Sequence, residues 1–145
     1  MNLQKFILCI ILACITLTQS LFCSNPRISI ITSVYKGDEF IEGFLADITR
    51  QTAFEQCELI MINANSPGNE EPTIKKYLEQ YPNIIYIKLE QDPGLYAVWN
   101  MAIEMSRGEY ITNANLDDRL APQCYEAHMA ALDANPDIML VYSNR

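Results

Sequence analysis

The residues after position 26 alternate between short apolar runs rich in β-branched side chains and amphipathic segments with helical periodicity. This alternation constrains the fold strongly, because strands that alternate with helices form βαβ units and a mainly parallel sheet. The fold class is therefore α/β, with the sheet flanked by helices. The predicted strands are residues 28–34, 59–62, 84–89, 110–114 and 138–142, and the predicted helices contain residues 40–48, 72–81, 98–105 and 122–132.

The length and charge of the chain limit its class. Its 145 residues amount to about one domain, and its apolar share of 50% is that of a globular protein. The formal net charge of −8 argues against binding of nucleic acid or anionic lipid by general electrostatics, since both require a basic surface. Any phosphate group bound by this chain would therefore have to be held by a metal ion and backbone amides.

Residues 1–24 differ from the rest of the chain and resemble a targeting segment. Lys5 precedes an apolar run at residues 6–15, and no acidic residue occurs before Asp38. The run is short for a membrane span of about 20 residues but fits the core of a signal peptide, about 7–15 residues long. An uncleaved N-terminal anchor remains an alternative, because residues 21–23 extend the apolar stretch. Either interpretation predicts a membrane-anchored or exported protein.

Polar residues follow four of the predicted strands, and in parallel sheets ligands bind at these carboxyl ends. Asp117 and Asp118 are the most informative, because Mg²⁺ is usually held by one or two carboxylates together with substrate phosphates. The pair predicts a divalent-cation site and a phosphorylated ligand. A helix cap at Asp118 is the structural alternative. The candidate rim comprises Tyr35, Lys36, Asn63, Ala64, Asn65, Asp92 and Asn115–Asp118.

Several short motifs, taken together in their order and spacing, resemble family 2 glycosyltransferases of the GT-A fold. The matching segments are residues 28–37 (the opening strand), Gln51-Thr52 (the end of the first helix), Gly94 with Asn100 (the Gly-x-x-x-x-x-Asn helix) and residues 108–118 (a strand and the acidic motif). The resemblance covers residues 28–118. It implies a GT-A, Rossmann-like domain over residues 27–145, truncated before the part that binds the acceptor.

The resemblance implies transfer of a sugar from a nucleotide-diphosphate donor, with Mg²⁺ or Mn²⁺ at the diphosphate. Such a metal neutralises charge on phosphoryl oxygens. By motif position, Asp117 is the expected metal ligand. The expected donor-binding residues are Tyr35, Asn63, Asn65, Gly94, Asn100, Asn115 and Asp118. The expected partners are a nucleotide sugar and an unidentified acceptor, which is a glycan, a lipid or a protein, and no nucleic acid.

The chain also departs from the family pattern. Asn63–Ser66 replaces the common Asp-Asp-Gly-Ser, so a local Asx-type turn is as good an interpretation as nucleobase recognition. Trp99 replaces a frequent Arg, and the later segment that carries the family's catalytic base has no counterpart, so the catalytic residue of the expected inverting transfer stays unassigned. The alternative is a nucleotide-sugar-binding module without activity. A phosphoacceptor domain that uses an Asp at a strand end ranks last.

The other reactive side chains have ordinary structural interpretations. His128 lies on the apolar stripe of its predicted helix and is expected to be structural. Cys57 and Cys124 have no evident neighbouring base, so no thiol nucleophile is expected, although the two would be able to pair in an exported domain. Trp99, with Tyr96, is expected to pack rather than to stack on a ligand. Arg119 either pairs with neighbouring acids or reaches a phosphate.

Overall fold

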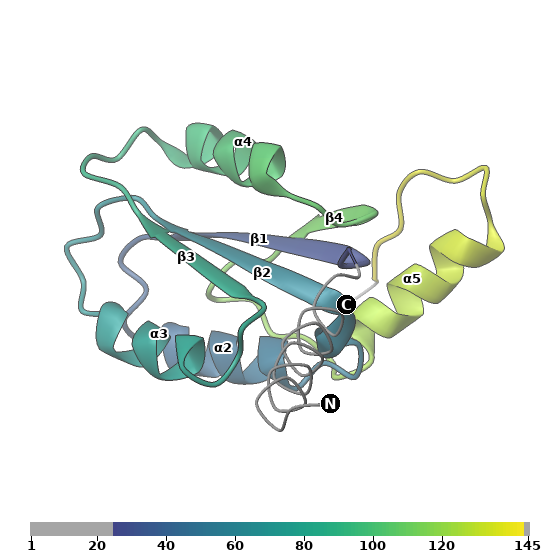
Figure 1. The fold of residues 1–145 in the computed structure, drawn as a ribbon, viewed down its shortest axis with the longest axis horizontal. Helices are drawn as coiled ribbons and strands as arrows, with labels where there is room; N and C mark the ends of the chain where they lie inside the picture. The colour runs from purple at the N-terminus through teal and green to yellow at the C-terminus, as the bar shows by residue number, and fades with distance from the viewer. Residues whose placement is uncertain (1–24, 144–145) are drawn as a thin grey trace, which may run out of the picture.

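The computed structural model describes residues 25–143, and these form a four-stranded parallel sheet with helices on both faces (Figure 1). The strand order is β3-β2-β1-β4. The elements are β1 (Ile28–Val34), α2 (Ile41–Thr49), the 3₁₀ helix η1 (Phe54–Gln56), β2 (Cys57–Asn63), α3 (Glu71–Leu78), β3 (Ile84–Lys88), α4 (Leu95–Met105), β4 (Tyr110–Asn113) and α5 (Cys124–Ala134). The predicted α/β class with a parallel sheet is confirmed.

The two central strands are apolar on both sides, as expected for a parallel sheet that helices cover on each face. Successive side chains of a strand point to opposite faces. Ile30 and Leu59 therefore contribute to the core shared with α2, α3 and α5, whereas Ile60 and Ile62 pack with α4. Figure 1 shows α4 on one face of the sheet and α2 with α3 on the other.

The helices form where the apolar periodicity predicts them. In α2 the buried side chains are Ile41, Phe44, Leu45 and Ile48, which recur at helical spacing and make one apolar face. In α4, Val98 and Ala102 are fully buried, and Met101 and Met105 pack beside them. Each boundary lies within a few residues of the prediction.

The predicted strand at residues 138–142 is wrong. These residues follow α5 without forming a strand, and Met139, Leu140 and Tyr142 are highly exposed. A hollow of ≈ 340 Å³ separates Met139–Val141 from β4, the last strand of the sheet as described. The segment has a strand-like composition, but it pairs with none of the described strands.

The predicted targeting segment, residues 1–24, lies outside the described residues. Within residues 25–143, no helix is long and apolar enough to cross a membrane.

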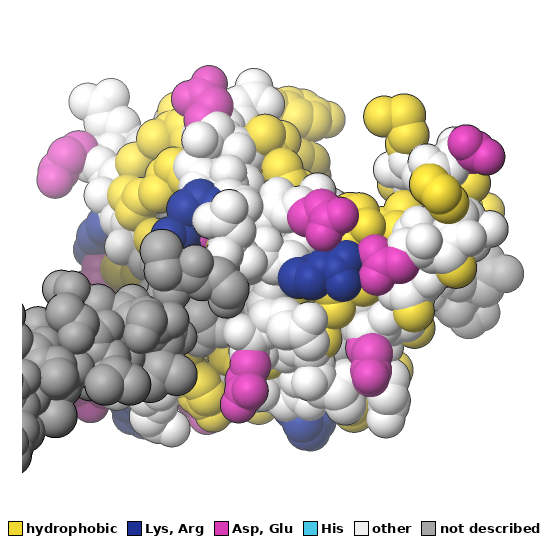
Figure 2. Space-filling view, turned by 45° about the vertical axis from the view of Figure 1, so that its right-hand side comes forward, with side chains coloured by type: hydrophobic (Ala, Val, Ile, Leu, Met, Phe, Trp, Pro, Cys, Tyr) yellow, Lys and Arg dark blue, Asp and Glu magenta, His cyan; other side chains and the backbone are white. Residues whose placement is uncertain are grey.

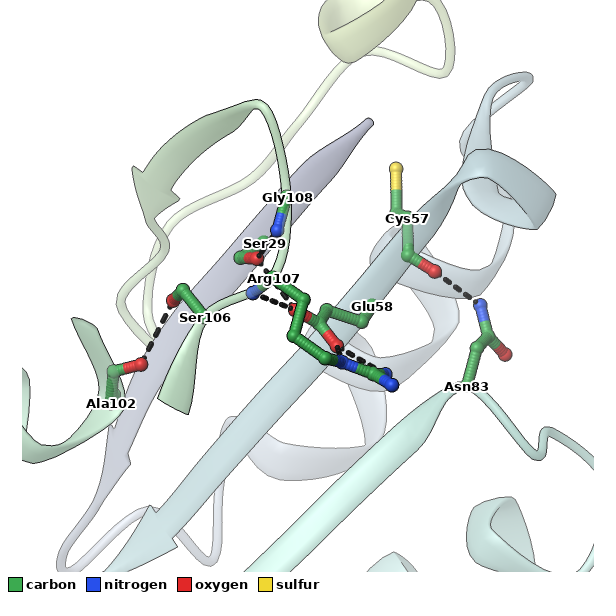
Figure 3. Close-up of polar contacts among 8 residues, drawn as sticks. All are labelled: Ser29, Cys57, Glu58, Asn83, Ala102, Ser106, Arg107 and Gly108. Atoms are coloured by element: carbon green, nitrogen blue, oxygen red, sulfur yellow. Dashed lines mark hydrogen bonds and ion pairs between the residues drawn. The ribbon is translucent and has the colours of Figure 1, made fainter. Parts of the chain in front are cut away.

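An ion pair between a buried carboxylate and a largely exposed arginine joins the amino ends of the strands (Figure 3). The carboxylate of Glu58 on β2, which is 2% exposed, accepts hydrogen bonds from Arg107 Nε (3.0 Å) and Nη2 (2.7 Å) and from the Arg107 backbone N–H (2.7 Å). Ser29 on β1 donates its hydroxyl to the same carboxylate (2.7 Å) and accepts the N–H of Gly108 (2.8 Å). These contacts fasten the segment before β4 to the two central strands.

This environment lowers the pKa of the Glu58 carboxyl group below its ordinary value. Burial raises the pKa, but the hydrogen bonds from Ser29 and Arg107, with the positive charge of Arg107, outweigh burial and lower it overall. Glu58 is therefore ionised when the protein is folded at neutral pH, which allows the ion pair to form.

Candidate functional site

A cleft of ≈ 230 Å³ lies at the carboxyl ends of β1 and β4, where the sequence predicts the rim. The residues that line it are Ser33, Tyr35, Lys36, Gly37, Phe40, Leu95, Asn115, Leu116 and Asp117. The structure thus brings together three of the predicted site residues, Tyr35, Asn115 and Asp117, from two segments about 80 positions apart. The first residue of α4 closes the cleft at a third side.

The segment after β1 supplies an aromatic ring and a cation. Tyr35 is 43% exposed, and the Lys36 ammonium lies 5.3 Å from the centre of its ring, within cation–π range. Lys36 has a φ of 53°, a left-handed conformation that is costly for a residue with a side chain and is frequent at functional sites. Its backbone N–H donates to Ser66 Oγ (2.9 Å), so this amide is engaged within the chain.

The segment after β4 is a turn that leaves one carboxylate exposed. Asp118 Oδ2 accepts hydrogen bonds from Asn115 Nδ2 (3.0 Å) and from the Asn115 N–H (3.3 Å), and the Asp118 N–H donates to Asn115 O (3.1 Å). Leu116 is buried below the turn at 7% exposure. Asp117 is exposed and borders the cleft, whereas Asp118 is half-buried and does not line it.

The two asparagines after β2, Asn63 and Asn65, do not line the cleft. Asn63 is 1% exposed, donates Nδ2–H to the Tyr86 hydroxyl (2.9 Å) and accepts the N–H of Ser66 at Oδ1 (2.7 Å). These are the contacts of a local turn, and the side chain of Asn63 does not reach the cleft. Asn65 is exposed with a φ of 54°, again outside the cleft lining.

The residues at the start of α4 border the cleft only through Leu95. Gly94 has a φ of 89°, which favours glycine, and its N–H donates to Asp92 Oδ1 (2.8 Å). Asn100 is exposed and does not line the cleft. Tyr96 is 78% exposed and touches the partly buried Trp99 edge-on, with 5.9 Å between ring centres.

The residues present can be tested for their fit to a divalent cation. Within residues 25–143, no three His, Cys, Asp or Glu side chains form a metal-binding group. Mg²⁺ needs no such group when substrate phosphates complete its shell, because one or two carboxylates then suffice. The exposed Asp117 carboxylate, which lines the cleft together with Asn115, fits a cation that arrives with a diphosphate and does not fit a cation held by protein side chains alone.

A larger hollow of ≈ 480 Å³ lies at the opposite end of the sheet, near the amino ends of β1 and β2. Its two arginines are already paired: Arg107 with Glu58 (2.7 Å), and Arg27 with Asp133 (2.7 Å) and Glu109 (3.2 Å). In Figure 2 the basic group near the centre of the view likewise lies between two acidic side chains. Size therefore does not identify the ligand site here, and Lys36 with Asp117 makes the smaller cleft the better candidate.

Arg119 pairs with an acid of another element. Its Nη1 lies 3.7 Å from Asp47 Oδ2 on α2. The sequence predicts either pairing with the neighbouring acids or contact with a phosphate, whereas this ion pair is with an acid distant in sequence.

One side-chain cluster was missed by the sequence analysis. Cys124 Sγ lies 3.8 Å from His128 Nε2, which in turn lies 2.7 Å from Ser143 Oγ. The expectation that Cys124 has no neighbouring base is therefore wrong. The i, i+4 spacing on one helix places the two side chains on the same face, and this signal was present in the sequence. Cys57 and Cys124 are both free thiols.

We expect iodoacetamide to alkylate Cys124 in the native protein much faster than Cys57. Cys57 is 2% exposed, and burial raises its pKa to about 12, so it has little thiolate at neutral pH. Cys124 is half-buried, at the first residue of α5 and beside an imidazole. Mass spectrometry of the separated peptides measures each rate, and a His128→Ala variant should slow only Cys124. Equal rates for the two thiols would contradict the described burial.

Comparison with known proteins decides the family. Residues 29–145 match Glycosyl transferase family 2. The chain belongs to this family. An uncharacterised glycosyltransferase of Methanocaldococcus jannaschii is 29% identical over 120 residues, and GgaB, a minor teichoic acid biosynthesis protein of Bacillus subtilis, is 29% identical over 103 residues. These alignments cover 82% and 70% of this chain, but only 41% and 11% of the two relatives.

Solved structures confirm the GT-A fold of this family 2 member. The mannosyltransferase PcManGT of Pyrobaculum calidifontis, in complex with GDP-Man and Mn²⁺, has a TM-score of 0.71 at 19% identity. It is matched over 80% of this chain and 34% of its own. TarS 1-349 of S. aureus, in complex with UDP-GlcNAc, also has a TM-score of 0.71, at 20% identity, over 76% of this chain and 32% of its own.

Proposed function

We propose that this domain binds the nucleotide-diphosphate part of a sugar donor in the cleft between Tyr35–Gly37 and Asn115–Asp117, for transfer of the sugar to an acceptor. The observation that carries the proposal is the position of Asp117, an exposed carboxylate that shares a small cleft with the cationic Lys36. Opposite charges on the two sides of one cleft suit a diphosphate and the cation bound to it. Family membership supports the same class of donor.

Each side chain of the cleft has a distinct part in this proposal. Asp117, with the Asn115 side chain, would hold Mg²⁺ or Mn²⁺, and the metal when bound neutralises the charge of the leaving diphosphate. Lys36 Nζ meets a phosphate oxygen directly. The half-exposed ring of Tyr35 provides a flat apolar surface against which the nucleoside can pack. The Lys36 N–H is bound to Ser66, so side chains rather than this amide hold the phosphates.

The proposed donor class has support from related folds. PcManGT was solved with GDP-Man and Mn²⁺, and TarS with UDP-GlcNAc. Both ligands are nucleotide-diphosphate sugars, although their bases differ. Because the identities are 19% and 20%, these structures support the class of donor and leave the base and sugar to experiment.

A donor-binding module without activity of its own is the second candidate. The observation in its favour is that Asp117 is the single carboxylate among the described residues that line the cleft. If Asp117 holds the metal, an inverting transfer needs another carboxylate near the acceptor hydroxyl as its base. The chain spans less than half the length of these two relatives, and none of the described residues is assigned the role of this base.

We further propose that residues 1–24 target the domain to a membrane or export it. The apolar run after Lys5 supports this. Deleting residues 2–24 from a tagged chain should move it from the membrane or exported fraction to the cytosolic fraction. An unchanged distribution would contradict the proposal.

Calorimetric titration with UDP and with GDP, each with and without Mn²⁺, tests the proposed function. We expect one nucleotide to bind, and to bind more tightly with Mn²⁺. A matched titration with AMP, which lacks the diphosphate, is the control and should show no metal-dependent gain. If neither nucleotide binds, both candidate functions are contradicted. Metal-dependent binding without transfer to any acceptor would favour the second.

A further inference from the structure

Two loops meet beneath the donor cleft, and one buried carboxylate joins them. Glu70 is the last residue before α3 and is 1% exposed. Its Oε1 accepts the N–H of Gly37 (2.7 Å) and the hydroxyl of Ser66 (2.7 Å). Gly37 belongs to the β1–α2 loop and Ser66 to the β2–α3 loop. Glu70 therefore bonds to both loops from a single oxygen atom.

Ser66 extends this connection by one more step. While its hydroxyl donates to Glu70, its Oγ accepts the backbone N–H groups of Lys36 (2.9 Å) and Gly68 (3.1 Å). A hydroxyl has one donor and two acceptor positions, and all three are used. Glu70 thus accepts the N–H of Gly37 directly, and Ser66, which is itself bonded to Glu70, accepts the N–H of Lys36. These two consecutive amides belong to the wall of the cleft.

We propose that Glu70 is a positioning residue for the donor cleft, holding the Tyr35–Gly37 wall in place through the N–H of Gly37 and the hydroxyl of Ser66. The proposal rests on the proposed function, since it concerns the same cleft. The left-handed backbone of Lys36 supports it, because such a conformation persists only where surrounding contacts hold it. Without these bonds the loop would relax, and the side chains of Tyr35 and Lys36 would leave their present directions.

The other oxygen of Glu70 favours a positioning role over a role in stability. Oε2 is buried, without a hydrogen-bond partner among the residues described. A buried carboxylate is costly, and half of this one receives no compensation. A glutamine at this position keeps an acceptor oxygen for Gly37 and Ser66 and removes the charge. Glu70→Gln should therefore retain the loop geometry, whereas Glu70→Ala should lose it.

The test compares Glu70→Ala, Glu70→Gln and a matched control, Ile74→Ala. Ile74 lies one turn further along α3 and is fully buried in the core, so its loss creates a cavity away from the two loops. Amide hydrogen exchange of Lys36 and Gly37 is measured by NMR in the free protein, together with the thermal midpoint and the Kd for the nucleotide with Mn²⁺.

In Glu70→Ala we expect exchange of both amides to rise about tenfold and nucleotide affinity to fall about tenfold, the factor for one lost hydrogen bond. Glu70→Gln should retain most of both values. Ile74→Ala should lower the thermal midpoint without a selective change at the two amides. Unchanged exchange and affinity in Glu70→Ala, or the same selective loss in Ile74→Ala, would overturn the proposal.

The same measurements separate failure of this role from failure of the proposed function. If the unchanged protein binds no nucleotide, both the proposed function and the role of Glu70 fail. If the unchanged protein binds the nucleotide and Glu70→Ala binds it equally well, only the role of Glu70 fails.

Discussion

Replacing Arg107 by alanine should lower the free energy of unfolding by about 3 kcal/mol, the lower end of the range for a broken buried ion pair. The guanidinium is the charged partner of Glu58, whose side chain is 2% exposed, so its loss leaves a buried carboxylate without a cation. The lower end applies because the Arg107 side chain is 63% exposed and already shares its charge with water. Urea unfolding at neutral pH measures the loss.

Two further variants separate the ion pair from general effects of the substitution. The double variant Glu58→Met/Arg107→Met should recover much of the lost stability, because no buried charge then remains. Lys75→Ala is the control, since Lys75 pairs with Glu71 at 3.9 Å on the surface of α3, where an exposed ion pair contributes little to stability. Equal losses for Arg107→Ala and Lys75→Ala would contradict the described burial of Glu58.

The same ion pair predicts how stability changes with pH. Because folding lowers the pKa of Glu58, its contribution is fully present above the unfolded value of about 4.3 and is lost as pH falls through the lower folded value. Arg107→Ala removes the guanidinium hydrogen bonds and the positive charge, which are part of the cause of the lowered pKa, and leaves the hydrogen bonds from Ser29 and from the backbone N–H of residue 107. The stability difference between the two proteins should therefore be constant near neutral pH and shrink in acid. A difference that grows in acid would have the wrong sign for this account.

Asp117→Asn should abolish the contribution of Mn²⁺ to nucleotide binding, because the loss of even an outer-shell partner of a metal typically costs about 10–100-fold in metal affinity and the loss of a direct ligand should cost at least as much. Asparagine has nearly the shape of aspartate but no charge, so the cleft keeps its form while the cation loses its expected carboxylate. Asp117 is exposed and its turn is anchored by Leu116, so the variant should fold normally. Calorimetric titration with the nucleotide, at several Mn²⁺ concentrations, measures the effect.

Glu104→Gln is the matched control for Asp117→Asn. It also removes one exposed negative charge, but Glu104 lies near the carboxyl end of α4, whereas the cleft borders the first residue of that helix. Its metal-dependent affinity should equal that of the unchanged protein. If both variants bind alike, Asp117 is not the metal ligand, and the role assigned to the cleft would need another carboxylate.

The sequence predicts the sheet well because the strands and helices carry periodic apolar patterns. Strands such as β1 and β2 are buried on both faces, and this burial removes their apolar side chains from water. The segment at 138–142 has a similar apolar composition but does not form a strand. The composition of a segment does not show whether a neighbouring strand is available for pairing, so the sequence pattern alone predicts this segment wrongly. Pairing depends on the sheet, which is a property of the whole domain.

The candidate site could be predicted only in part. The carboxyl ends of parallel strands meet by topology, so Tyr35, Asn115 and Asp117 share a cleft as expected. The direction of a side chain in a loop follows from its hydrogen bonds, which sequence does not give: Asn63 turns inward to Tyr86, and Asp118 braces its own turn. Glu70 went unnoticed because its partners, Gly37 and Ser66, are recognisable only once the two loops are placed together.

Line broadening by Mn²⁺ tests the location of the donor site most directly. Mn²⁺ is paramagnetic and broadens the NMR signals of nearby amides, so spectra recorded with nucleotide and trace Mn²⁺ show where the metal lies. We predict nucleotide-dependent broadening of the amides of Tyr35–Gly37 and Asn115–Asp118, and none at Glu58 or Arg107 at the other end of the sheet. Broadening at the amino ends of the strands, or broadening that does not depend on nucleotide, would contradict the account.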